Sequence, residues 1–171
     1  MSLSTFLAPA VIGLAAAAGA YALWTRRSRT YHSSESVASA YDAWTDDRLL
    51  ETLWGEHVHL GHYGDPPIRR DFRRAKADFV HELVHWSGLD RLPPGSRVVD
   101  VGCGIGGSAR ILARDYGFDV LGISISPAQI QRATELTPEG LSCRFEVMDA
   151  LNPKLADAEF DGVWSVEAGP H

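Results

Sequence analysis

The fold of this chain is decided by the stretch Val98-Val99-Asp100-Val101-Gly102-Cys103-Gly104-Ile105-Gly106-Gly107. Its branched apolar residues predict a buried β-strand. The glycines at 102, 104 and 107 match the pattern G-x-G-x-x-G. Because glycine lacks a Cβ atom, the backbone can turn tightly there and a bound molecule can lie against its amides. The sequence therefore predicts a strand, a ligand-binding turn and a helix, in that order.

Asp100 sharpens this prediction because it stands two residues before the first glycine, where its carboxylate can accept a hydrogen bond from an ammonium group. An aspartate followed by Gly-Cys-Gly-x-Gly resembles motif I of the class I methyltransferases that use S-adenosyl-L-methionine. The competing interpretation is a nicotinamide dehydrogenase, which usually carries an acidic residue about 20 positions past the loop. The corresponding strand end has serines at 124 and 126 instead. The sequence thus favours a methyltransferase over a dehydrogenase.

The composition is that of one globular domain with a sizeable core, because 45% of the 171 residues are hydrophobic and 22% are charged. Residues 1–30 contain three arginines and no acid, so the net charge of −6 leaves −9 for the remainder. This acidic balance argues against a nucleic-acid partner. Two cysteines, Cys103 and Cys143, do not suggest a disulfide framework, and a reduced compartment is expected.

The amino terminus predicts a membrane anchor. Residues 6–24 carry no charge and are long enough to cross roughly 30 Å of hydrocarbon as a helix. Arg26, Arg27 and Arg29 follow at once and favour a cytoplasmic catalytic domain. A cleaved signal peptide is the alternative, but residues 1–5 lack a basic region. We therefore divide the chain into an anchor (1–30), a linker and N-terminal cap segment (31–67), and a cofactor-binding methyltransferase domain (68–171).

The pattern of the remaining chain predicts an α/β fold. A polar linker is expected over residues 28–36, the soluble part is expected to start near Tyr41, and residues 71–86 predict an amphipathic helix. Strands are expected at 97–101, 119–123, 143–147 and 160–166, with helices at 108–116 and 127–136. Ser108 and Ser126 are expected to cap the two helices. Such alternation predicts a Rossmann-like parallel sheet with helices on both faces and ligands at its carboxyl edge.

Two histidine-containing segments need separate interpretations. Residues 81–88 match H-E-x-x-H-x-x-G, the start of a zinc-protease site, but the third ligand position is Arg91, which cannot bind zinc. We expect no metal and take His81 and His85 as a solvated helix face. For the histidines at 57, 59 and 62, an active-site role and a bland structural role both remain open.

The expected cofactor site follows the carboxyl edge of the sheet. The loop should contact the methionine portion, Ser124 and Gln129 the ribose, and Asp149 with the backbone of Ala150 the adenine. The full set of predicted cofactor-binding residues is Asp100, Val101, Gly102, Cys103, Gly104, Ile105, Gly106, Gly107, Ser124, Gln129, Asp149 and Ala150.

The fourth strand carries the candidate catalytic residues. A phenolic methyl acceptor needs a base near its hydroxyl, and histidine titrates close to neutral pH. His171 is the first candidate and Glu167 the second, because both follow the strand end where the methyl group should sit. The alternative is that both residues only shape the pocket.

From residue 31 onward, the chain resembles the tocopherol methyltransferases. The matching segments are Ala40-Tyr41-Asp42, Trp54-Gly55, residues 57–63, the glycine-rich stretch, residues 122–127 and residues 164–171. The resemblance implies ring-carbon methylation of a prenylated quinol of the 2-methyl-6-phytylbenzoquinol type in vitamin E synthesis, at the membrane that dissolves this lipid. It leaves protein partners open.

The resemblance also implies three more strands and an acceptor-binding region, so we expect the chain to be truncated after its fourth strand. Its last strand would then leave an unpaired edge. Two alternatives stay open. One is that the chain is a non-catalytic fragment that keeps only a cofactor half-site. The other is that it is a methyltransferase for another lipid, such as a sterol.

Overall fold

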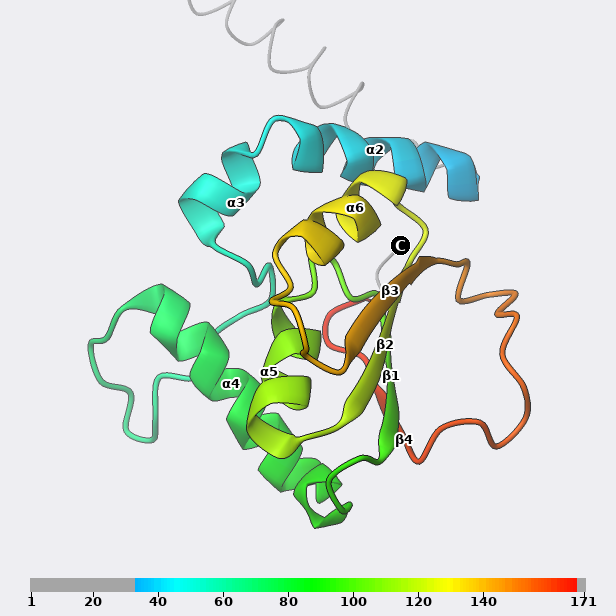
Figure 1. Ribbon diagram of the computed structural model, residues 1–171. Coiled ribbons are helices and arrows are strands. Elements are labelled where there is room, and N and C mark those ends of the chain that lie inside the picture. Colours follow the sequence, from blue (N-terminus) through cyan, green and yellow to red (C-terminus); the bar gives the residue numbers. More distant parts are fainter. Residues whose placement is uncertain (1–32, 169–171) are drawn as a thin grey trace, which may run out of the picture. The chain divides into compact units, whose positions relative to one another are not determined.

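The computed structural model describes residues 33–168 (Figure 1). The predicted anchor at residues 6–24 and the candidate base His171 lie outside the described residues. None of the helices between residues 33 and 168 is long and apolar enough to cross a membrane. The elements are α2 (Ser34–Asp46), α3 (Leu49–Trp54), α4 (Phe72–Ser87), the 3₁₀ turn η1 (Leu89–Arg91), β1 (Arg97–Val101), α5 (Gly107–Tyr116), β2 (Asp119–Ser124), α6 (Pro127–Glu135), β3 (Cys143–Val147) and β4 (Gly162–Trp164).

The four strands of the described part form one parallel sheet, as the sequence predicted, and the structure gives their order as β3-β2-β1-β4. β1 pairs with β2 along its whole length, from Arg97 opposite Asp119 to Val101 opposite Ile123. The residues of β1 and β2 are almost all buried, which explains their continuous branched apolar sequences. All four carboxyl ends therefore lie at the same edge of the sheet.

Helices α4, α5 and α6 lie on one face of the sheet and α2 packs on α6, whereas helices on both faces were expected (Figure 1). The crossovers from β1 to β2 and from β2 to β3 run in one direction, so right-handed connections place α5 and α6 on the same side. The return from β3 to β4 crosses the other face and contains no helix. There Leu155 and Phe160 pack on Val99 and Leu121.

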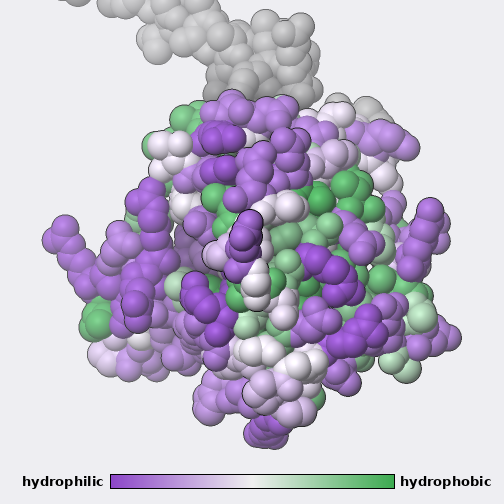
Figure 2. Space-filling view, in the orientation of Figure 1, coloured by the Kyte–Doolittle hydropathy of each residue, from purple (hydrophilic) through white to green (hydrophobic). Residues whose placement is uncertain are grey.

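The main core lies between the sheet and the helices α4 and α5. Val84 from α4, Leu112 from α5, Val120 from β2 and the connecting Phe118 are completely buried in it. In Figure 2, hydrophobic residues gather on the β3 side of the visible face, whereas hydrophilic residues cover the α4 side. Leu151, which is 91% exposed, belongs to the connection between β3 and β4.

Several predicted boundaries are confirmed and others are wrong. Ser126 caps α6 by accepting from the Gln129 amide. Ser108 does not cap α5; it is buried within the helix, and Gly106 holds the cap position because the loop needs a left-handed residue there. β4 is shorter than the predicted 160–166. The expected polar linker already becomes helical at Ser34, because Ser33 caps α2.

Candidate functional site

The glycine-rich loop turns back over the end of β2. The amides of Gly102 and Cys103 both donate to the carbonyl of Ile123, over 2.9 and 3.0 Å. Gly102, Gly104 and Gly106 have φ values of +75°, +55° and +81°, which side chains rarely adopt. A Cβ atom added to Gly104 would meet no atom within 4 Å, so this side of the loop is open to a ligand.

Gly107, the last glycine of the pattern, is required for packing rather than for a positive φ. A Cβ atom there would lie 2.6 Å from the carbonyl oxygen of Glu56 and 2.8 Å from the ring of His57. A Cβ atom on Gly102 would lie 2.3 Å from that of Ala168. The loop therefore lies between residues 57–62, which we call the histidine segment, and the residues that follow β4.

Asp100 lies beneath the loop at the end of β1. Its side chain is 3% exposed, and its Oδ2 atom has no hydrogen-bond partner among residues 33–168. Burial raises the pKa of this carboxyl to about 7. A buried acid with an unsatisfied oxygen can take up a hydrogen-bond donor such as an ammonium group.

The structure brings together the two residues that were predicted to hold a ribose. The Ser124 hydroxyl donates to Oε1 of Gln129 over 2.7 Å and accepts from the Ser126 amide over 3.2 Å. Asp42 was named from the sequence only as part of a segment that resembles the tocopherol methyltransferases, and its contact with the start of α6 was not predicted. Its Oδ1 accepts from the Ser126 hydroxyl (2.5 Å) and the Ala128 amide (3.1 Å), which fixes α2 to the start of α6.

Asp149 and Ala150 follow β3 at the same edge. Asp149 accepts from the Leu151 amide over 2.9 Å, and its other oxygen accepts from the Ser34 hydroxyl over 3.2 Å. Ala150 is exposed. Their predicted adenine contact stays a prediction.

His57 and His59 form a pair beside the loop. The His59 Nδ1 atom lies 2.7 Å from the Leu60 carbonyl oxygen, so it carries a proton and donates. Its Nε2 atom is then the acceptor for Nδ1–H of His57, at 3.2 Å. This arrangement leaves Nε2 of a neutral His57 as a hydrogen-bond acceptor. Burial, together with the nearby His59, Arg110 and Lys76, lowers the pKa of His57 to about 3, so it is neutral at pH 7.

Glu167 reaches the same segment from the end of β4. Its Oε1 atom accepts from the Leu60 amide over 3.1 Å, and its backbone has a φ of +54°. Burial lowers the pKa of His59, and the negative charge of Glu167 partly offsets this by raising it. The structure thus brings together Glu167 and the histidine segment, an association that the sequence left open.

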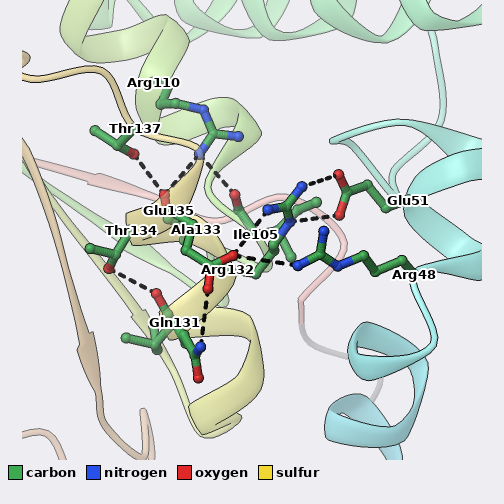
Figure 3. Close-up of polar contacts among 11 residues, drawn as sticks. Arg48, Glu51, Ile105, Arg110, Gln131, Arg132, Ala133, Thr134, Glu135 and Thr137 are labelled. Carbon is green, nitrogen blue, oxygen red and sulfur yellow. Dashed lines mark hydrogen bonds and ion pairs between the residues drawn. The ribbon is translucent and has the colours of Figure 1, made fainter.

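Arg110 connects three parts of this region, and Figure 3 shows its contacts with two of them, the loop and α6. Its buried guanidinium donates to the carbonyl of Ile105 in the loop (2.9 Å) and to that of Ala133 in α6 (3.3 Å). It also forms an ion pair with Glu56, 2.6 Å away and next to His57. Sequence reasoning missed Arg110, since no local pattern marks an arginine in a helix as buried.

A second ion pair fixes the cap segment to α6. Arg132 donates to both carboxylate oxygens of Glu51 over 2.7 and 2.8 Å (Figure 3). Both side chains are mostly buried, and such two-pronged pairs combine strength with a defined geometry. α3 is therefore held against α6 by this pair.

The histidines of the H-E-x-x-H pattern have separate partners. His81 Nδ1 lies 2.8 Å from the hydroxyl of Tyr116, and His85 Nδ1 lies 3.0 Å from a carboxylate oxygen of Asp90. His85 is an exposed residue, as expected, whereas His81 is packed against Tyr116.

A family model and curated relatives both connect this chain with methyltransferases. Residues 98–171 match the family described as "Methyltransferase domain". The chain is 61% identical, over 94% of its length, to the 2-methyl-6-phytyl-1,4-hydroquinone methyltransferase of Synechocystis sp.. It is 42% identical, over 80% of its length, to a probable chloroplastic tocopherol O-methyltransferase of Oryza sativa. The chain spans 49% of the first relative and 39% of the second, about half of their length or less.

Among solved structures, the cyclase SpnF resembles the chain with a TM-score of 0.67 and 29% identity. The match covers 77% of this chain and 48% of that protein. The same architecture therefore occurs in a protein named for a different reaction, and the fold alone does not define the chemistry.

The buried acid generates a prediction about pH. Between the ordinary aspartate pKa near 4 and the raised value of about 7, the unfolded chain is ionised at residue 100 while the folded protein keeps the proton. Folding stability from this group should therefore fall as the pH rises through this window. Relative to the Asp100→Asn variant, the wild-type free energy of unfolding should drop by on the order of 4 kcal/mol and level off above pH 7. Urea unfolding without added ligand measures it, and parallel profiles for the two proteins would contradict it.

Proposed function

We propose that the protein methylates a ring carbon of a prenylated benzoquinol, of the 2-methyl-6-phytyl type, with S-adenosyl-L-methionine as methyl donor. The match of residues 98–171 to the methyltransferase domain and the similarity to the tocopherol methyltransferases support this proposal. The observation that carries this proposal is the 61% identity over 94% of the chain to an enzyme named for such a substrate.

The loop and its surroundings fit such a cofactor. Gly104 presents open space where a ligand can lie against the backbone, and the left-handed φ values keep side chains out of that space. The unsatisfied Oδ2 atom of the buried Asp100 offers an acceptor beneath the loop. An amino acid ammonium group would satisfy this atom and favour the ionised carboxylate.

We assign the remaining cofactor contacts as the sequence predicted them. Ser124 and Gln129, already 2.7 Å apart, would hold the ribose hydroxyls, and Asp149 with Ala150 would hold the adenine. Asp42 keeps the Ser126 turn in place through two hydrogen bonds, so the ribose pair starts from an ordered position. Arg110 does the same for the glycine-rich loop through the Ile105 carbonyl.

When bound, the cofactor supplies a methyl group that its positive sulfur has already activated. The remaining task of the protein is to align the acceptor carbon and to manage the hydroxyl proton. Glu167 is held by the Leu60 amide at the end of β4, next to the loop. We propose that Glu167 orients the hydroxyl, and that His171 takes its proton.

The cofactor assignment predicts the effect of a single loop substitution. Gly104→Val should abolish saturable binding of S-adenosylhomocysteine, because the branched side chain would fill the ligand's space and strain a residue at φ +55°. Gly140→Val is the matched control, since Gly140 has φ +81° and equally open surroundings but lies between α6 and β3. Calorimetry should show binding for the control only. Saturable NADH binding without S-adenosylhomocysteine binding would overturn the assignment.

The catalytic assignment predicts a loss of turnover without a loss of cofactor binding. His171→Ala should lower turnover by about 10²- to 10⁴-fold, the usual range for a lost general base. Glu167→Gln keeps an acceptor for the Leu60 amide but removes the charge, and it should also slow the reaction. His85→Ala is the control, because His85 is exposed and bound to Asp90. If the His171→Ala variant kept wild-type turnover, His171 would not be the catalytic base.

We also propose that residues 6–24 anchor the protein, with the catalytic domain on the cytoplasmic side and the substrate in the same bilayer. Their uncharged sequence, followed by three arginines, supports this. Deleting residues 1–30 should release the protein from membranes in a high-salt wash. A deleted form that still pelleted after this wash would place the anchor elsewhere.

A further inference from the structure

A cavity of about 390 Å³ lies between α3, α4 and α5, on the helical side of the sheet. Its walls include the cationic side chains of Arg73, Lys76, Arg110 and Arg114. None of them was among the predicted site residues. Gly107, a predicted cofactor contact, also lines the cavity, so the cavity adjoins the end of the glycine-rich loop, and Arg110 contacts both.

Lys76 gives the cavity a buried positive charge without an ion-pair partner among the described residues. Its side chain belongs to a residue that is only 5% exposed, and its ammonium donates to the carbonyl oxygens of Trp54 (3.1 Å) and His57 (2.6 Å). It also lies 4.9 Å from the centre of the Trp54 ring. No carboxylate forms an ion pair with it in the described part of the chain, although the charge of Glu167 raises the pKa of Lys76 and so opposes the lowering caused by burial. Buried charges are normally paired, so this ammonium is suited to an anionic ligand.

The two acidic side chains of the cavity are already engaged. Glu51 is held by Arg132 and Glu56 by Arg110. Arg73 donates to the Thr52 carbonyl and has no carboxylate partner among the described residues. Arg73 and Lys76 therefore remain as cations available to an anion, within a chain whose net charge is −6.

A third feature is the neutral acceptor of His57, which also lines the cavity. Its Nε2 atom has no hydrogen-bond partner among residues 33–168, and the contact with His59 fixes it as an acceptor. The cavity thus offers cations for an anionic group and an acceptor for a hydroxyl. A phosphate that carries a hydroxylated substituent matches both.

The sequence segment that contributes Trp54 to the cavity is rich in exposed apolar residues. Eight of the twelve exposed large hydrophobic residues of the described part fall between residues 44 and 68. They are Trp44, Leu49, Leu53, Trp54, Val58, Leu60, Tyr63 and Ile68. Trp54 itself lines the cavity, and Leu53 and Val58 adjoin its lining residues in sequence. Tryptophan, tyrosine and aliphatic residues beside arginines are typical of surfaces that lie in the headgroup region of a bilayer.

We propose that this cavity binds the phosphate head group of an anionic membrane lipid, with Leu53, Trp54 and Val58 lying in the bilayer interface. Arg73 and Lys76 contact the phosphate, and His57 accepts from a head-group hydroxyl. Leu60, 72% exposed, lies beside Glu167. The docked face therefore leads to the proposed reaction site, and a prenylated substrate can enter from the bilayer.

Two neighbouring arginines provide a matched test in the full-length chain. Arg73 lines the cavity, whereas Arg74 pairs with Asp78 and does not. Affinity is measured for vesicles of phosphatidylcholine alone and with about one third phosphatidylglycerol. Both variants keep residues 1–30 with their three arginines, so any contribution of this segment cancels when Arg73→Gln and Arg74→Gln are compared. Arg73→Gln should reduce the phosphatidylglycerol-dependent affinity about five-fold or more, whereas Arg74→Gln should change it less than about two-fold. Arg73→Lys should recover part of the loss.

The orientation of the docked protein is measured with nitroxide labels. A label at Leu53→Cys should become accessible to oxygen and shielded from a water-soluble nickel chelate when vesicles are added. A label at Trp86→Cys should stay in water, because Trp86 is 84% exposed near the other end of α4. An unchanged far-ultraviolet circular dichroism spectrum and thermal unfolding midpoint verify that each variant is folded.

Several outcomes would overturn the proposal. Equal losses for Arg73→Gln and Arg74→Gln would indicate diffuse charge attraction rather than a site. A label at Leu53 that is shielded without vesicles would show that protein covers this face. Binding of inorganic phosphate in the cavity, without any preference for phosphatidylglycerol vesicles, would assign it to a soluble anion. The inference does not depend on methyl transfer, since vesicle docking would remain measurable in a protein that methylates no prenylated quinol.

Discussion

A single buried guanidinium holds together the parts of this protein that its chemistry requires. Arg110 donates to the glycine-rich loop through Ile105, to α6 through Ala133, and to Glu56 of the segment that carries the histidines. A buried arginine is stable only when its donors are satisfied, and these three partners satisfy it. Because the partners come from separate regions, the loop, α6 and the histidine segment take up one arrangement together. The same side chain forms part of the cationic cavity wall.

Burial and neighbouring charges shift the pKa values of two site residues in opposite directions. Burial raises the pKa of Asp100 beneath the loop, whereas burial and neighbouring cations lower that of His57 on the other side of Gly107. One site favours a neutral acid that can meet an ammonium, and the other a neutral imidazole that accepts hydrogen bonds. The overall acidic chain also concentrates cations around one cavity. The proposed cofactor contact and the proposed lipid site therefore differ in the charge that each favours.

The N-terminal cap is attached through specific polar contacts. Asp42 binds the start of α6, and Glu51 pairs with Arg132 near its end. Each contact joins residues more than 80 positions apart. The attached cap covers part of α6 and leaves eight large apolar side chains of residues 44–68 exposed.

The sequence by itself determined the parallel sheet, the turn after β1 and the cap at Ser126, because these depend on local patterns: branched strands, glycines that tolerate positive φ, and a hydroxyl before Pro127. It also placed Ser124 beside Gln129. Only the tertiary structure decided that helices cover one face in the described part, that Gly107 accommodates His57, and that Asp42, Glu56 and Glu167 meet their distant partners. It likewise showed that Ser108 is buried rather than capping. Such contacts depend on how whole elements pack, and packing brings together residues whose separation in sequence carries no periodic signal.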